Sequence, residues 1–344
     1  MAIVTTNIKE LNRCTPEFFF TQVAPSNEPV VLKNIAAHWD LVKAAQVSDE
    51  AAAAYLKSFY NGRPVGASVA APEVKGRFGY NQDATQLNFE KRQVNLNETL
   101  DLILAERSNP TPSSFYIGST SLEGYLPQLR TRNNLDAYFD LFNLEKGGLL
   151  ESIWIGNHTI ASCHYDAPYN IACCVAGKRR FTIFPPEQIT NLYPGPLDPT
   201  PGGQAISMVD FNNPDFEKYP RFRAAMVAGQ FAELEPGDAI FIPSMWWHHI
   251  EALNTFNILI NYWWRLSPGY MSTPMNVLKY ALMSMRDRPE HEKRAWQAVF
   301  NYYIFGDADV ASEHLPEAAR GVLGPMDDLQ ARQIRAFLIN SLNR

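Results

Sequence analysis

Two short stretches of the sequence hold side chains of the types that bind metal ions. The first is His164-Tyr165-Asp166, and the second is His248-His249, which directly follows two tryptophans. If His164 and Asp166 lie on one strand, they project from the same face, because side chains alternate along a strand. We expect His248 at the end of another strand, after a tight turn. Two histidines and one carboxylate on one side of a metal leave coordination positions open, which suits non-haem Fe(II) and oxygen chemistry.

Each half of this pattern is weak when it is judged alone. A buried histidine near tryptophans is often a hydrogen-bonded core residue, and a His-x-Asp triplet also arises by chance. The order of the two stretches and the room for several strands between them favour the metal interpretation. Other catalytic signatures are absent from the sequence, namely GxGxxG, a Walker-type loop, GxSxG and HExxH.

The elements that would position these residues are short strands. From about Ser114, β-type runs alternate with Gly and Pro, which is typical of a sandwich or barrel. The runs cover residues 114–118, 152–156, 179–184, 239–242 and 257–264. The Pro- and Gly-rich residues 194–203 predict a long connection between strands, because such a stretch suits neither a helix nor a central strand.

The sequences before and after this β-rich region have helical patterns. Before it, Thr15-Pro16, Ser48 and Asn95 have the pattern of helix starts, and residues 29–35 form one β-type run. After Pro268, three runs have apolar residues at helical spacing. We therefore predict three parts: a mixed α/β region packing on the barrel (1–113), a catalytic barrel (114–268) and a helical region (269–344).

The composition narrows the class of protein. The chain has 344 residues, of which 46% are hydrophobic, and a formal net charge of −6. This acidic balance disfavours nucleic-acid binding. We find no apolar run of the ~18 residues that a membrane span needs, and no signal-peptide pattern at the start. The four cysteines form no CxxC pair, which favours a reducing compartment. We expect a cytoplasmic protein with no membrane or nucleic-acid partner.

An ordered series of motifs resembles the JmjC class of cupin-like Fe(II)/2-oxoglutarate oxygenases. Within that class, it is most similar to the type of the factor-inhibiting-HIF asparaginyl hydroxylase. The resemblance is specific over about residues 152–264 and weaker before them. Its motifs are His164-Tyr165-Asp166, Asn170, and residues 177–181, 184–186, 191–194, 209–211, 213–216, 236–238, 242–243, 246–250 and 261–263.

The resemblance implies a fold, a metal and a cosubstrate. The fold is a mainly β double-stranded β-helix, or jelly-roll barrel, with flanking helices and a C-terminal helical segment. The metal is Fe(II), with His164, Asp166 and His248 as its ligands. The cosubstrates are 2-oxoglutarate and O2, and no catalytic residue beyond the metal ligands is implied. The neighbouring His249 would be a packing residue.

The family places a lysine where this chain has Arg179, as the cation for the distal carboxylate of 2-oxoglutarate. By strand alternation Arg179 shares a face with Phe181, whereas Lys178 points the other way. We therefore favour Arg179 and keep Lys178 as the alternative. The resemblance further assigns to the cosubstrate site Tyr116, Asn170, Asn261 and Trp263. The family's threonine before the His-x-Asp triplet corresponds to either Thr159 or Ser162.

The expected function is a hydroxylase that couples oxidative decarboxylation of 2-oxoglutarate to C–H hydroxylation. Its substrate is a protein side chain or a small molecule, and the sequence does not decide between them. The family's substrate-holding polar groups are replaced by residues 205–208, AISM, which departs from asparaginyl hydroxylation. The alternatives are a non-catalytic binding module and a metal-dependent cupin enzyme that does not use 2-oxoglutarate. The resemblance also implies a homodimer formed through the C-terminal helices.

Overall fold

A computed structural model describes residues 4–139 and 148–342 of the chain. The chain divides into two compact units, Met1–Arg265 and Leu266–Arg344.

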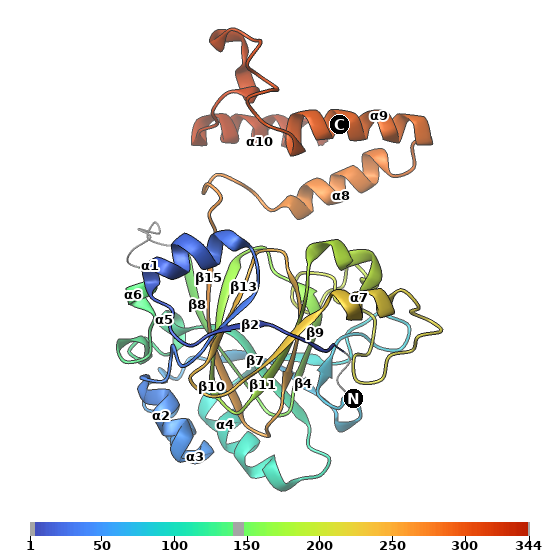
Figure 1. Cartoon of the computed structure of the whole chain (residues 1–344). Helices are drawn as coiled ribbons and strands as arrows, with labels where there is room; N and C mark the ends of the chain where they lie inside the picture. The colour runs from blue at the N-terminus through green and yellow to red at the C-terminus, as the bar shows by residue number, and fades with distance from the viewer. Residues whose placement is uncertain (1–3, 140–147, 343–344) are drawn as a thin grey trace. The chain divides into compact units, whose positions relative to one another are not determined.

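Two β-sheets form the centre of the first unit (Figure 1). In its described residues the larger sheet has nine strands, in the order β2 (Lys9–Leu11), β3 (Val30–Leu32), β13 (Ala239–Ile242), β10 (Tyr169–Ala176), β15 (Asn257–Trp264), β8 (Leu149–Gly156), β7 (Ser114–Ser121), β4 (Val65–Ala70) and β6 (Glu90–Val94). The smaller sheet has six described strands, in the order β1 (Thr6–Asn7), β12 (Gln230–Leu234), β11 (Arg179–Phe184), β14 (Trp247–Ala252), β9 (Ile160–Tyr165) and β5 (Arg77–Phe78).

The chain passes back and forth between the two sheets. Strands β8, β10, β13 and β15 belong to the larger sheet, whereas β9, β11, β12 and β14 belong to the smaller one. Every pairing between two of these eight strands is antiparallel. This alternation is the jelly-roll arrangement of a double-stranded β-helix, so the predicted fold is confirmed.

The interior of the barrel is built from the inward side chains of both sheets. One buried cluster combines Phe181 and Ile183 of β11 with Ile240 and Ile242 of β13 and with Leu259 of β15. The alternation of side chains along the strand places Ile258, Ile260, Tyr262 and Trp264 of β15 on the opposite face.

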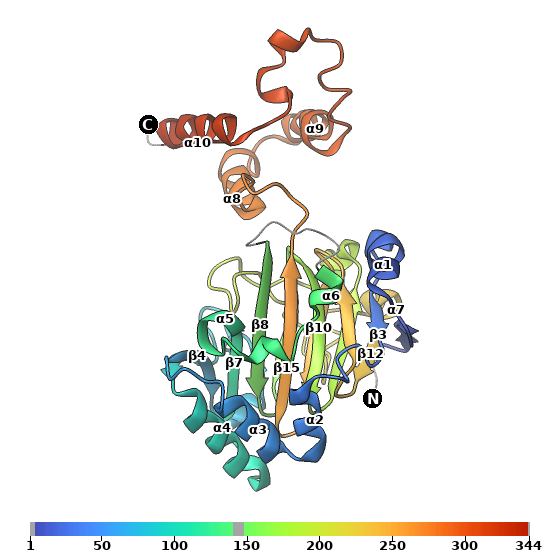
Figure 2. The ribbon, with the colours of Figure 1, turned by 90° about the vertical axis from the view of Figure 1, so that its left-hand side faces the viewer.

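That opposite face of the larger sheet forms the main core with the helices. Figure 2 looks onto this sheet, where β10, β15, β8 and β7 lie side by side. The helices α2 (Asp40–Val47), α3 (Asp49–Lys57) and α4 (Leu96–Ala105) place apolar residues in the same core as Ile258, Ile260 and Tyr262 of β15. The side chains of Ser48 and Asn95 cap α3 and α4, as expected. The shorter helices of this unit are α1 (Pro16–Phe18), α5 (Leu122–Tyr125), α6 (Asp136–Phe139) and α7 (Phe222–Ala228).

The observed elements refine two expectations about the metal-binding stretches. Strand β9 ends at Tyr165, so Asp166 lies one residue beyond it rather than on the same strand as His164. His248 is the second residue of β14 and follows the turn after β13. Residues before Ser114 also supply strands to both sheets, among them β4, β5 and β6. The predicted boundaries at 114 and 268 stay predictions.

The second unit is helical. Its helices are α8 (Pro274–Met285), α9 (Glu290–Phe300) and α10 (Asp328–Leu342). The Thr273 hydroxyl accepts a hydrogen bond from the backbone of Met275 and caps α8. Large apolar side chains on all three helices are exposed, including Met283, Trp296 and Phe337. Among the described residues, no helix combines the length and the apolar character needed to cross a membrane.

Candidate metal centre

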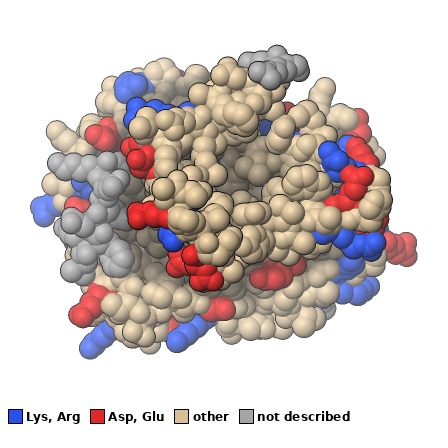
Figure 3. Space-filling model, turned by 90° about the horizontal axis from the view of Figure 1, so that it is seen from above, with Lys and Arg blue, Asp and Glu red and all other residues tan. Residues whose placement is uncertain are grey.

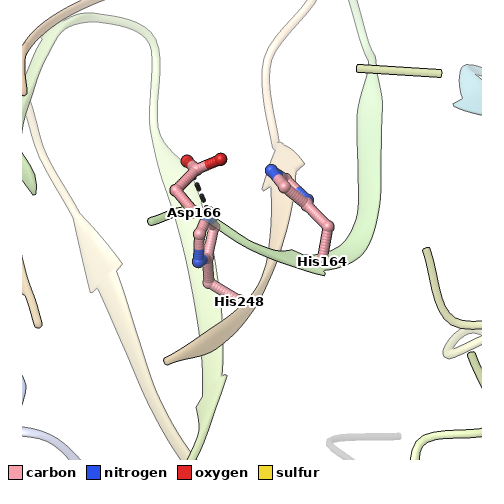
Figure 4. A group of neighbouring side chains, drawn as sticks. All are labelled: His164, Asp166 and His248. Atoms are coloured by element: carbon pink, nitrogen blue, oxygen red, sulfur yellow. Dashed lines mark ion pairs between the residues drawn. The ribbon is translucent and has the colours of Figure 1, made fainter. Parts of the chain in front are cut away.

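Three side chains converge inside the barrel: His164 of β9, His248 of the neighbouring β14, and Asp166, which directly follows β9 (Figure 4). One ligand atom from each of His164, Asp166 and His248 lies within 4.8 Å of the other two. His164 and His248 are directly opposite each other in the pairing of β9 with β14. Asp166 follows β9 at the same end. The three residues predicted as ligands are therefore brought together by the fold.

Backbone carbonyl groups orient both histidine rings. The Nδ1 atom of His164 lies 2.8 Å from the carbonyl oxygen of Ser162, and that of His248 lies 3.0 Å from the carbonyl oxygen of Trp246. Because a carbonyl oxygen only accepts hydrogen bonds, Nδ1 carries the proton in both rings. The lone pair of each ring is then on Nε2, and the Nε2 atom of His248 lies 3.5 Å from Oδ2 of Asp166.

The turn between β13 and β14 fixes the backbone at Asp166. The Met245 N–H donates to the carbonyl oxygen of Asp166 at 2.8 Å, and the Ser244 hydroxyl donates to that of Ala167 at 2.6 Å. Met245 has a φ of 68°, in the left-handed region that a methionine rarely adopts. Strain of this kind persists where the surrounding structure imposes it, and it clusters at functional sites.

The charges at the site favour the protonation states that bind a metal. Burial, together with the nearby His248, lowers the pKa of His164 to about 4. Burial alone would raise the pKa of Asp166, but the two neighbouring histidines and the hydrogen bond from Gln204 outweigh it, so this pKa is lowered. Near neutral pH, His164 is therefore neutral and Asp166 is ionised, as metal coordination requires.

Arg179 is a buried cation with unsatisfied donors. Its side chain is only 3% exposed, and among the described residues its Nε and Nη2 atoms have no hydrogen-bond partner. Burial lowers the pKa of its guanidinium group. Lys178, in contrast, lies on the surface and pairs with Glu235 at 2.7 Å. Of the two cations considered for the cosubstrate, only Arg179 is inside the barrel.

The two predicted asparagines are linked by a short chain of hydrogen bonds. The indole N–H of Trp154 donates to Oδ1 of Asn261 at 2.7 Å. The amide nitrogen of Asn261 then donates to Oδ1 of Asn170 at 3.3 Å. Trp263 meets Trp154 edge to face, with their ring centres 5.8 Å apart, and its own buried indole nitrogen has no partner among the described residues.

Tyr116 connects this aromatic cluster with the charged groups. Its ring stacks on Phe78, with their centres 5.7 Å apart, and it also contacts Trp154. Burial raises the pKa of its phenol to about 12, with opposing effects from the charges of Arg179 and Asp166. The phenol of Tyr116 therefore stays protonated near neutral pH.

Sequence reasoning missed two residues of this site. Trp154 lies on the inward face of β8, and the alternation within residues 152–156 is the signal that could have found it. Gln204 donates a hydrogen bond from Nε2 to Oδ1 of Asp166 at 2.9 Å. It belongs to the loop between β11 and β12, where no periodic pattern marks which side chains point inward.

The remaining candidates near the site have separate roles in packing and hydrogen bonding. The Ser162 hydroxyl donates to the backbone carbonyl of Phe78 at 3.1 Å, and Thr159 is buried. The ring of His249 stacks on Phe211 with their centres 4.3 Å apart. His249 lies on the outward face of β14, opposite to that of His248.

The metal-binding group lies near the end of the barrel at which β15 finishes. Figure 3 shows one face of the molecule, on which Lys and Arg side chains lie among Asp and Glu side chains. Charged side chains lie mostly around the edge of that view. Because Asp166 lies between the end of β9 and the start of β10, and Tyr169 at the start of β10 pairs with Trp264 at the end of β15, the metal-binding group is near this end.

Comparisons with known proteins identify relatives. A family described as "Cupin-like domain" matches residues 16–270. HSPB1-associated protein 1 of Bos taurus is 31% identical over 157 residues, which are 44% of this chain and 31% of that protein. Lysine-specific demethylase 8 of Xenopus tropicalis is 25% identical over 260 residues, 75% of this chain and 53% of that protein. Lysine-specific demethylase JMJ31 of Arabidopsis thaliana is 34% identical over 114 residues, 33% of this chain and 20% of that protein. The chain spans about a third of the length of the first relative and about half that of the second.

Proposed function

Because the chain belongs to the cupin-like domain family, we propose that it is an Fe(II)- and 2-oxoglutarate-dependent oxygenase. In this proposal it couples oxidative decarboxylation of 2-oxoglutarate to hydroxylation of a C–H bond in a protein side chain or a small molecule. The observation that carries the proposal is the buried Arg179, a cation with unpartnered donors in the same barrel as a His-Asp-His group. A free buried cation of this kind calls for an anion.

The metal would be held by three atoms whose orientation is already set. These are Nε2 of His164, Nε2 of His248 and one carboxylate oxygen of Asp166. Two imidazoles and one carboxylate on one side are the donor set of non-haem Fe(II) oxygenases and leave other positions open. The donor set and its protonation states therefore fit Fe(II).

The cosubstrate would lie between the metal-binding group and Arg179. On the ladder of β11 with β14, Ile183 is opposite His248 and Arg179 is opposite Ala252. Four residues of strand separate the two positions, or about 13 Å at ~3.3 Å per residue. A short dicarboxylate bound to both the metal and Arg179 would occupy that interval. A guanidinium group can bind a carboxylate with two parallel hydrogen bonds.

The surrounding residues position the cosubstrate and limit access of water. Asn261 and Asn170 present amide groups fixed by the bond from Trp154. Trp154, Trp263 and Tyr116 line the interior with aromatic rings. When bound, Fe(II) and 2-oxoglutarate supply the oxidising chemistry: O2 is consumed, 2-oxoglutarate becomes succinate and CO2, and a substrate C–H becomes C–OH. The protein's contribution is orientation, charge and exclusion of water.

The names of two relatives bear on the kind of C–H bond. They are described as lysine-specific demethylases, and hydroxylation of an N-methyl carbon gives a product that loses formaldehyde. The substrate class of this chain remains that of the proposal above, a protein side chain or a small molecule.

The test measures binding and turnover in parallel. Purified protein is titrated anaerobically with Fe(II), and then with 2-oxoglutarate by calorimetry. Succinate release is followed after O2 is admitted. We expect stoichiometric Fe(II) binding, metal-dependent binding of 2-oxoglutarate and succinate release that Asp166→Ala abolishes. The surface substitution Asp101→Ala on α4 is the matched control and should leave all three unchanged, because Asp101 is exposed.

The alternatives give different results in the same test. A binding module would release no succinate with any of a broad panel of peptides and metabolites. A cupin enzyme independent of 2-oxoglutarate would bind Fe(II), but its calorimetric trace with 2-oxoglutarate would be flat. Equal succinate release by wild type and Asp166→Ala would contradict the proposed role of the metal-binding group.

A further inference from the structure

We propose that Gln204 is a positioning residue that holds the Asp166 carboxylate in the orientation that binds the metal. The inference rests on the proposed function in one respect, because it assumes that a divalent metal occupies the group formed by His164, Asp166 and His248. It adds a residue from a distant loop to that site.

The two oxygens of Asp166 have different surroundings. Oδ1 accepts a hydrogen bond from the Gln204 amide at 2.9 Å. Oδ2 faces the Nε2 atom of His248 at 3.5 Å, which is the side on which the ligand atoms converge (Figure 4). The amide thus occupies one oxygen and leaves the other for the metal.

A glutamine suits this task because it donates without adding charge. A lysine or arginine at this distance would compete with the metal for the carboxylate. The uncharged amide fixes the rotation of the carboxylate and leaves its full negative charge for the cation. Partners of this kind orient metal ligands in many sites, and their loss typically weakens metal binding by about 10–100-fold.

The loop that carries Gln204 is attached next to the metal ligands. Its ends meet where the Gly195 N–H donates to the carbonyl oxygen of Ile206 at 2.8 Å. The next residue, Ser207, donates its N–H to the carbonyl oxygen of Cys163 at 2.7 Å. Cys163 directly precedes His164 on β9. The loop 195–206 is therefore fastened beside the first histidine, and this attachment places Gln204 within reach of Asp166.

Burial around the end of the loop supports a defined position for this side chain. Ala205, Ile206 and Ser207 are 4%, 5% and 1% exposed, so the backbone that follows Gln204 is packed into the protein. The Ser207 hydroxyl also donates to the carbonyl oxygen of Leu192 at 2.6 Å. The glutamine thus projects from an anchored segment rather than from the free tip of a loop.

The experiment compares metal binding in three full-length variants. Gln204→Met keeps the length of the side chain but removes its N–H donors, and Gln204→Ala removes the side chain. Gln188→Met is the matched control, since Gln188 is also half-buried but its amide oxygen accepts from Asn191 and it does not contact Asp166. Affinity is measured by calorimetry with Mn(II), and ligand geometry by the visible absorption of the Co(II) form. Urea unfolding of the metal-free proteins checks the fold.

We expect both Gln204 variants to bind Mn(II) about 10-fold or more weakly and to change the Co(II) spectrum, while Gln188→Met matches wild type. A role in loop packing alone would lower the unfolding free energy without altering the Co(II) spectrum, and would overturn the inference. Unchanged affinity and spectrum in Gln204→Met, with a wild type that binds metal, would overturn it while the proposed function stands. A wild type that binds no metal would instead refute the proposed function itself.

Discussion

Replacing Arg179 by methionine should make the metal-free protein more stable and at the same time abolish tight binding of 2-oxoglutarate. Among the described residues, Nε and Nη2 of this buried guanidinium have no hydrogen-bond partner. A buried donor left unsatisfied costs about 1–3 kcal/mol, and more when it is charged. Removing two of them should raise the unfolding free energy by about 2 kcal/mol or more, because methionine fills a similar volume with apolar atoms.

The effect on cosubstrate binding has the opposite sign. Two charge-assisted hydrogen bonds to a carboxylate contribute about 1.5–3 kcal/mol each. Their loss should weaken the binding of 2-oxoglutarate by about 3 kcal/mol or more. This corresponds to an affinity about 100-fold lower, at 1.4 kcal/mol per factor of ten. A variant that gains stability but loses affinity for 2-oxoglutarate shows that Arg179 serves binding, whereas a structural cation would lose stability when it is replaced.

The assay uses urea unfolding of the metal-free protein and calorimetry of 2-oxoglutarate in the presence of Mn(II). Lys178→Met is the matched control, because Lys178 directly precedes β11 and its side chain pairs with Glu235 on the surface; it should change neither quantity. The reasoning is refuted if Arg179→Met destabilises the protein while 2-oxoglutarate binds with unchanged affinity. That result would mean that the guanidinium has structural partners and no role in holding the acid.

Three further predictions concern the neighbourhood of the site and the second unit. Trp154→Phe removes the hydrogen-bond donor to Asn261. The affinity for 2-oxoglutarate should fall about 3–10-fold, which corresponds to the loss of one hydrogen bond. An unchanged affinity by calorimetry would contradict this. His249→Phe should preserve Mn(II) binding, because His249 stacks on Phe211 on the outward face, whereas His248→Phe should abolish it. We also propose that the chain forms a homodimer through the exposed apolar residues of α8, α9 and α10. Phe337 is 69% exposed, so Phe337→Glu should disrupt this interface and give half the molar mass of wild type by light scattering. An unchanged mass would rule out α10 as the interface.

Several strands of the barrel could be predicted because their sequences alternate or are continuously apolar between turn residues, whereas β10 and β12 were not among the predicted runs. Residues 179–184, 239–242 and 257–264 match β11, β13 and β15 in full. Strand β6 was not recognisable, since its sequence EKRQV is largely exposed and carries three charged residues. An edge strand of this kind has no buried face, so no hydrophobic period marks it.

Only some residues of the candidate site could likewise be predicted from the sequence. His164 and Arg179 could be placed from alternation along a strand, because each is on the face that carries the interior residues of its own strand. The bond from Gln204 to Asp166 spans 38 positions of the chain and starts in a loop without a pattern. Its existence depends on where the ends of that loop attach, which only the folded backbone determines.

The two kinds of metal ligand therefore depend on different parts of the chain. Each histidine is oriented by the carbonyl group two residues before it, Ser162 for His164 and Trp246 for His248. This support is local, so any chain that forms the paired strands β9 and β14 also sets both rings. Asp166 lies beyond its strand and depends on Met245 for its backbone and on Gln204 for its carboxylate. Substitutions in the loop 195–206 should consequently change metal affinity through Asp166 while both histidine rings keep their orientation. Sequence variation in this loop can therefore adjust the affinity of the metal-binding group without removing a ligand.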